Sequence, residues 1–259
     1  MAPYSVRSWL ARLGLPVYLA ALVGCGSSVV EGSIEVLATF PHDTAAYTQG
    51  LVWENGQLLE STGRYGHSTL RRVDPETGEV LQMVELDSAY FGEGLARVGE
   101  NLVQLTWREN VAFVYDAETF EVVDTLPLPT FGWGLCTSDG VAYLTGGGSA
   151  LYRRSVPSWE DLGFSQMEQG GALLRDVNEL ECVGPFVYAN IYQSDTIVKM
   201  DRETGQVVAV FDASALVPAH LRGSPDAVLN GIAHDPDTDT WYLTGKLWPV
   251  MYQVRLVQN

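Results

Sequence analysis

The chain has 259 residues, of which 32 are acidic and 15 are basic, so its formal net charge is −17. A hydrophobic content of 46% is enough to form a large core, which excludes an intrinsically disordered chain. The acidic balance argues against binding to nucleic acid, because phosphate backbones are bound by clustered Lys and Arg.

The N-terminal segment has the pattern of an export signal. Two arginines precede an apolar run at 13–24, which is too short to span a membrane. The end of this run, Leu22-Val23-Gly24-Cys25, resembles the lipobox of bacterial lipoproteins, in which cleavage precedes the cysteine and its thiol is acylated. We therefore expect a cleavable signal peptide at 1–24, followed by a lipid-anchor cysteine and tether at 25–33.

The lipobox interpretation also predicts a location. The chain would lie on the periplasmic side of a bacterial membrane, in preference the outer membrane, and would be attached only through Cys25. An ordinary export signal with a chance cysteine would instead make the protein secreted.

The mature chain would keep two further cysteines, Cys136 and Cys182. Two cysteines are no disulfide framework. A single bridge between them and two buried free thiols are both consistent with the sequence.

A first repeat predicts short strands joined by tight turns. Its four copies begin at Leu70, Val114, Arg153 and Val198, and the clearest ones contain Asp and Gly at the turn. These residues suit turns because they tolerate positive φ or bond their own backbone.

A second repeat sets the architecture. Five triplets occur at intervals of 44, 40, 45 and 52 residues, and each is followed by a turn and a β-rich run. A period of this length that is filled with short strands indicates propeller blades. We therefore expect residues 34–259 to form one domain, an all-β five-bladed β-propeller; the alternative, a β-sandwich, would not require a repeat. The triplets are Gln49-Gly50-Leu51, Glu93-Gly94-Leu95, Trp133-Gly134-Leu135, Asn178-Glu179-Leu180 and Asn230-Gly231-Ile232.

The repeat also predicts where a site would lie. Equivalent positions in a closed ring have the same radius and height, so the head residues of the triplets should converge on one mouth of a central channel if their strands are innermost. The ends of the following strands give a second ring: Thr62, Trp107, Gly147, Tyr192 and Lys246.

Polar groups between aromatic walls are typical of a small-ligand pocket, although the same residues could serve packing alone. Trp107 and Trp133 could fill space between blades, and Asn230 could satisfy backbone groups. Glu93 and Lys246 are harder to explain in this way, because charges on inner strands are costly unless they are paired or used.

Many ordered motifs resemble those of the plant and bacterial glutaminyl cyclases. The resemblance runs from about Pro41 to Tyr252 and includes Tyr47-Thr48-Gln49-Gly50-Leu51, Phe91-Gly92-Glu93-Gly94-Leu95, Gly132-Trp133-Gly134-Leu135, Val177-Asn178-Glu179-Leu180-Glu181 and Thr244-Gly245-Lys246-Leu247-Trp248-Pro249. It implies a five-bladed propeller that converts N-terminal glutamine of peptides and proteins to pyroglutamate and releases ammonia. It also implies no cofactor and no catalytic metal, and we expect a monomer.

The resemblance places the family's active-site positions on seven residues: Gln49, Phe91, Glu93, Trp107, Trp133, Asn178 and Lys246. All but Phe91 belong to the two rings. Two departures concern specificity more than the reaction: Tyr192 stands where the family usually has Trp, and Thr130-Phe131 stands where it usually has Gly-Glu.

The chemistry predicts a role for each group. Glu93 would take a proton from the substrate's α-amine and return one to the leaving nitrogen. Asn178 and Lys246 would hold the amide oxygen as it becomes an oxyanion. The substrate would be bound and shielded from water by the remaining residues, Gln49, Phe91, Trp107, Trp133, Tyr192 and Asn230.

Two other functions remain open. A metal-dependent, lactonase-like propeller hydrolase would need several Asp, Glu or His ligands that converge on the channel. A lipid-anchored propeller that only binds proteins would need neither Glu93 nor Lys246 in the channel.

Overall fold

The computed structural model describes Met1 and residues 29–258. These residues form β-strands and two short 3-10 helices, η1 (Ser214–Leu216) and η2 (Ala219–Leu221), so the prediction of an all-β fold is confirmed. The predicted signal peptide at 1–24 and the predicted lipidation site, Cys25, lie outside the described residues. No helix within the described residues is long and apolar enough to cross a membrane.

Three antiparallel sheets have four strands each, and in each sheet the strands pair in chain order. The first sheet contains β2 (Thr48–Glu54), β3 (Gln57–Thr62), β4 (Thr69–Val73) and β5 (Val80–Glu85). The second contains β6 (Gly92–Val98), β7 (Asn101–Thr106), β8 (Val111–Asp116) and β9 (Val122–Pro127). The third contains β10 (Leu135–Ser138), β11 (Val141–Leu144), β12 (Ala150–Ser155) and β13 (Asp161–Gln166), and is followed by a hairpin of β14 (Glu168–Gln169) and β15 (Ala172–Leu173).

The remaining strands form one eight-stranded sheet that consists of two four-stranded arrays. One array is β16 (Val177–Val183), β17 (Phe186–Ile191), β18 (Thr196–Asp201) and β19 (Val207–Asp212). The other is β20 (Leu229–Asp235), β21 (Thr240–Gly245), β22 (Val250–Gln258) and, from the start of the chain, β1 (Val30–Pro41). The arrays are joined because β1 pairs antiparallel with β22 and parallel with β19.

The start of β1 corrects one predicted boundary. The strand begins at Val30, so residues 30–33 belong to the sheet and not to the tether that the sequence analysis placed at 25–33. The reason is the parallel pairing of Val30 with Ala209 and of Gly32 with Phe211. A sequence pattern does not reveal this pairing, because the partner strand lies far away in the chain.

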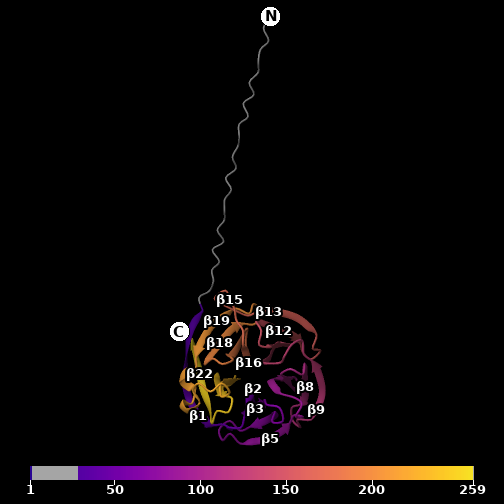
Figure 1. Cartoon of the computed structure of the whole chain (residues 1–259), viewed down its shortest axis with the longest axis vertical. Helices are drawn as coiled ribbons and strands as arrows, with labels where there is room; N and C mark the ends of the chain where they lie inside the picture. The colour runs from indigo at the N-terminus through magenta and orange to yellow at the C-terminus, as the bar shows by residue number, and fades with distance from the viewer. Residues whose placement is uncertain (2–28, 259) are drawn as a thin grey trace.

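The first strand of each array lies at the centre of a ring. In this ring β2 contacts β6, β6 contacts β10, β10 contacts β16, β16 contacts β20, and β20 contacts β2 again. Figure 1 shows the arrays arranged around this centre, with the outer strands β5, β9 and β13 at the rim.

The glycine of the triplets is explained by how closely the inner strands approach one another. A Cβ atom on Gly50 would lie 2.5 Å from the backbone nitrogen of Leu95, and one on Gly94 would lie 2.5 Å from the carbonyl oxygen of Trp133. Any larger residue at these two positions would push neighbouring inner strands apart.

The turns of the first repeat form as predicted. Asp74, Asp116 and Asp201 each accept hydrogen bonds from the backbone N–H and the hydroxyl of the threonine three residues later. These contacts close the turn before the outermost strand of three arrays, so the Asp-x-x-Thr spacing is local turn chemistry.

Cys136 on β10 and Cys182 on β16 form a disulfide bond. The sequence had left a bridge and two free thiols as alternatives, and the structure shows the bridge. It links the inner strands of two neighbouring arrays and thus fastens part of the ring covalently.

Candidate active site

The two predicted rings meet at one end of the central channel. Gln49, Glu93, Asn178 and Asn230 are each the second residue of an inner strand, while Trp133 lies two residues before β10. Trp107, Tyr192 and Lys246 each follow directly after the second strand of their array. Because these two strands are antiparallel, the start of one and the end of the other lie at the same edge.

A cavity of about 250 Å³ opens at this end of the ring. Eight of the nine predicted site residues line it, and the ninth, Asn230, does not. One lining residue, Tyr47, had not been predicted as a site residue. The lining consists of Tyr47, Gln49, Phe91, Glu93, Trp107, Trp133, Asn178, Tyr192 and Lys246.

Asn230 lies behind the cavity and fixes a residue that faces it. Asn230 is fully buried, and its Nδ2 donates to the carbonyl oxygen of Thr48 at 2.9 Å and to Oε1 of Gln49 at 3.3 Å. Since Oε1 of Gln49 already accepts this bond, the N–H groups of its amide are left to donate to a ligand. Asn230 therefore positions Gln49.

Tyr47 contributes a wall that sequence reasoning missed. Its ring makes an edge contact with Phe91 at a centroid distance of 6.2 Å. Lys246 Nζ lies 4.8 Å from the centre of the same ring. The available signal was the strand period of two, which places Tyr47 on the same face as Gln49.

The other aromatic side chains form two pairs. Phe91 and Trp107 lie 5.5 Å apart between ring centroids, and Trp133 and Tyr192 lie 5.6 Å apart in an edge arrangement. Gly147, the member of the second ring without a side chain, makes room for Trp133, because a Cβ there would lie 2.9 Å from the indole. Phe131, the other departure from the family pattern, is 46% exposed and does not line the cavity.

Glu93 and Lys246 are both almost completely buried, at 4% and 2% exposure. Burial raises the pKa of Glu93 well above its usual range, and the nearby Lys246 opposes this shift only in part. Burial likewise lowers the pKa of Lys246 to about 8, against the attraction of Glu93 and Asp226. For both groups the effect of burial on the pKa outweighs the attraction between them.

Asn178 is held in place by the residue that follows it. Glu179 occupies the triplet position where the other four inner strands have glycine. Its carboxylate accepts hydrogen bonds from the backbone N–H of Leu51 at 3.1 Å and of Ile232 at 2.9 Å. Glu179 therefore ties β16 to β2 and β20 directly beneath the cavity, and burial raises the pKa of its carboxyl well above the usual range.

The donor set of the cavity is one carboxylate, one ammonium and two carboxamides. Within the described residues, no group of three or more His, Cys, Asp or Glu side chains is arranged to hold a metal ion. The arrangement can exchange a proton at Glu93 and stabilise a negatively charged oxygen at Lys246.

Comparison with known proteins gives one consistent result. Residues 15–256 match the family model described as glutamine cyclotransferase. The chain is 39% identical over 229 residues to the glutaminyl-peptide cyclotransferase of Arabidopsis thaliana, a match that covers 87% of this chain and 72% of that protein. The crystal structure of Myxococcus xanthus glutaminyl cyclase superposes with a TM-score of 0.83 at 37% identity, over 90% of this chain and 100% of that one.

Proposed function

The chain belongs to the glutamine cyclotransferase family, and we propose that it converts the N-terminal glutamine of peptides and proteins to pyroglutamate with Glu93 as proton shuttle and without a metal ion. The observation that carries the mechanism is a buried carboxylate of raised pKa and a buried ammonium of lowered pKa in one small aromatic cavity.

The first step is loss of a proton from the substrate's α-amine. Only the neutral amine has a lone pair that can attack the side-chain carboxamide carbon. An α-amino group has a pKa of about 8, so a carboxylate of raised pKa exchanges a proton with it more readily than an ordinary glutamate would.

Ring closure then forms the bond between the α-nitrogen and the side-chain carbonyl carbon, and the carbonyl oxygen becomes an oxyanion. Glu93 first passes the proton of the α-ammonium group to water, then takes the second proton that the attacking nitrogen loses and delivers it to the departing nitrogen. The carbon–nitrogen bond of the carboxamide breaks, and ammonia leaves. The glutamine is thus converted to pyroglutamate and ammonia, and Glu93 returns to its starting state.

Lys246 and Asn178 are placed to stabilise the oxyanion. With a pKa of about 8, Lys246 carries its proton at neutral pH and can donate a charge-assisted hydrogen bond. Glu179 keeps Asn178 on a rigid part of the ring. The aromatic walls exclude water and hold the glutamine side chain in its ring-closing conformation.

We interpret the five four-stranded arrays as the five blades of the predicted propeller. The support is the cyclic order in which the five inner strands contact one another. The metal-free mechanism is supported by the donor set, since an ammonium beside a single carboxylate disfavours a second cation.

The proposed reaction can be tested with a glutaminyl dipeptide and a chain that begins at residue 26. We expect ammonia release and a pyroglutamyl product, both unaffected by EDTA. Release that EDTA abolishes would contradict the metal-free mechanism. If a folded sample released no ammonia, the chain would be a binding protein on a cyclase scaffold.

Export with a lipid anchor on Cys25 remains part of the proposal. The disulfide between Cys136 and Cys182 supports export, because such bonds persist in oxidising compartments. Mass spectrometry of the protein recovered from bacterial membranes should find an acylated N-terminal Cys25. An unmodified N-terminus in the medium would instead indicate a secreted protein.

A further inference from the structure

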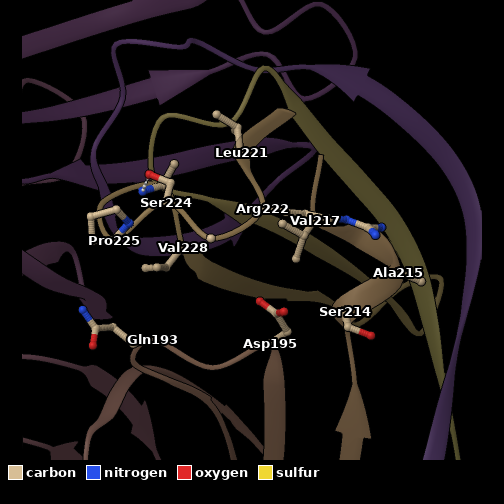
Figure 2. A pocket seen from close by; sticks show the side chains of 12 residues that line it. Gln193, Asp195, Ser214, Ala215, Val217, Leu221, Arg222, Ser224, Pro225 and Val228 are labelled. Carbon is tan, nitrogen blue, oxygen red and sulfur yellow. Dashed lines mark hydrogen bonds between the residues drawn. The ribbon is translucent and has the colours of Figure 1, made fainter. Parts of the chain in front are cut away.

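A second and larger cavity lies beside the candidate active site. Its volume is about 590 Å³, more than twice that of the first cavity. It lies between the short β17–β18 connection, which carries Gln193 and Asp195, and the long connection at 213–228 (Figure 2). We call this second cavity the outer groove.

The outer groove and the active-site cavity share their boundary. Gln193, which lines the groove, directly follows Tyr192, which lines the active site. Val228, on the other side of the groove, accepts a hydrogen bond through its carbonyl oxygen from the backbone N–H of Lys246 at 2.9 Å. The groove therefore begins where the walls of the catalytic cavity end.

The long connection also reaches across the mouth of the active site. The side chain of Asp226 lies 3.8 Å from the guanidinium of Arg64, which in turn packs 4.6 Å from the centre of the Tyr47 ring. The connection ends directly before β20, at the same end of the strands as the catalytic cavity. A chain that leaves this cavity thus meets the long connection at once.

The proposed reaction requires such an exit. Both reacting groups of the substrate, its α-amine and its carboxamide, belong to the first residue, and a cavity of about 250 Å³ suits one side chain. The rest of a peptide substrate continues from the carbonyl of that residue and must leave through the mouth. We propose that the outer groove binds the residues that follow the glutamine, and that Asp195 selects a basic side chain at the second or third position.

The lining of the groove fits an extended peptide. Its long side carries apolar side chains among polar ones, with Val217 buried and Leu221 and Val228 half-buried. Asp195 is exposed and points from the opposite side into the groove, and Figure 2 shows no hydrogen bond between its carboxylate and the other lining residues. Among the residues that line the groove, this carboxylate has no partner, so it can pair with a cation of the substrate.

Arg222 does not cancel this charge. In Figure 2 its guanidinium extends past Val217 toward Ala215, at the end of the groove opposite Gln193. A peptide that enters from the active site consequently passes Asp195 before it reaches Arg222. Among the residues that line the outer groove, the first charge that it meets is therefore negative.

The experiment compares kcat/KM for peptides with blocked C-termini: Gln-Ala, Gln-Ala-Ala-Ala, and tetrapeptides with one Lys or one Glu at the second or third position. We expect the better of the two Lys peptides to have a higher kcat/KM than the Glu peptide substituted at the same position. Asp195→Asn should lower the value for the Lys peptide about threefold to fivefold, as expected for a partly exposed ion pair, and leave Gln-Ala unchanged. Asp195→Lys should reverse the preference toward Glu.

The matched control is Glu85→Gln, which removes one negative charge from an exposed position on the outer strand β5. This control is needed because a chain with a net charge of −17 attracts every basic peptide to some degree. Equal losses in Asp195→Asn and Glu85→Gln, or equal values for Lys and Glu peptides in the unaltered chain, would overturn the proposal. The proposal rests on the cyclase function, and absence of turnover even with Gln-Ala would overturn that function instead.

Discussion

The ammonium of Lys246 lies between two aromatic rings, 4.8 Å from the centre of Tyr47 and 5.2 Å from the centre of Tyr192. A cation over an aromatic ring is attracted to its face, so both rings help to hold the ammonium in position. Together with the nearby carboxylates of Glu93 and Asp226, this attraction favours the protonated form of Lys246 against the effect of burial.

Replacement of Lys246 by Met should lower kcat by about 100-fold to 1,000-fold, as removal of an oxyanion donor does in other enzymes. KM should change little, because the interaction forms mainly in the transition state. Tyr47→Phe keeps the ring face and is the matched control, which we expect to stay within a few-fold of the unaltered chain. A loss confined to KM in Lys246→Met would contradict the oxyanion role.

Glu93→Gln should lower kcat by a factor of about 1,000 or more while the protein remains folded, since the substitution removes the proton acceptor and keeps the volume. The measurement is single-turnover ammonia release, accompanied by circular dichroism and a thermal melt. Because burial raises the pKa of Glu93, an uncharged replacement should not lower the melting temperature. Substantial turnover in a folded variant would exclude Glu93 as the shuttle.

The pH profile of kcat/KM should be bell-shaped. Activity requires Glu93 without its proton, so it rises with pH through a pKa that lies above the usual 4.5. It also requires Lys246 with its proton, so it falls as pH rises through about 8. Because the groups interact, the two limbs belong to the pair. In Lys246→Met the limb near pH 8 should disappear, and a limb that persisted there would have to come from another group.

A buried ion pair between His42 and Glu60 should make stability depend on pH. His42 Nε2 lies 3.0 Å from Glu60 Oε1. Burial lowers the pKa of His42, but the Glu60 carboxylate outweighs this and raises it above 6.5. Burial raises the pKa of Glu60, but His42, with help from Arg71 and Thr48, outweighs this and lowers the pKa below 4.5.

The two pKa shifts make the stability of the fold change with pH in opposite directions. The contribution of His42 is complete below pH 6.5, its unfolded pKa, and is lost as pH rises through the higher folded pKa. The contribution of Glu60 is present above pH 4.5 and is lost as pH falls through the lower folded pKa. Loss of one partner from a buried pair costs about 3 to 5 kcal/mol, so His42→Ala should lower the melting temperature more at pH 6 than at pH 9. An equal drop at both pH values would show that only packing is lost.

The bond between Cys136 and Cys182 should stabilise the ring without taking part in the chemistry. It closes a loop with a sequence separation of 46, for which the chain-entropy relation gives about 4 kcal/mol. The double variant Cys136→Ser/Cys182→Ser should therefore melt at a lower temperature and keep its kcat at 25 °C. A loss of kcat in the folded double variant would show that the bond also holds Asn178 in place.

The site was predictable where the repeat carried the information. The triplet heads and strand ends placed seven of the nine predicted residues around one cavity, because equivalent positions in a ring converge, and the family resemblance added Phe91. Asn230 lies at the predicted position in its inner strand, but its side chain does not face the cavity. Its side chain turns to Thr48 and Gln49, and sequence spacing does not determine a rotamer.

Other features depend on contacts that sequence spacing does not show. Glu179 bonds to Leu51 and Ile232, which lie 128 and 53 residues away. The pairing of β1 with β19 likewise joins Val30 to Ala209, which lie far apart in the chain, and it places residues 30–33 in the sheet. Both contacts form only because the ring closes, so the sequence alone does not predict them.

The pairing of β1 with β22 has a consequence for the order of assembly. Strand β1, at the start of the described chain, pairs with the C-terminal strand β22. The array of β20, β21, β22 and β1 therefore stays incomplete until the C-terminal residues have been synthesised. The catalytic cavity also forms late, because it contains both Gln49, near the start of the described chain, and Lys246, near its end. A nascent chain that lacks β22 therefore has an incomplete last array, although its sequence already contains every residue that lines the catalytic cavity.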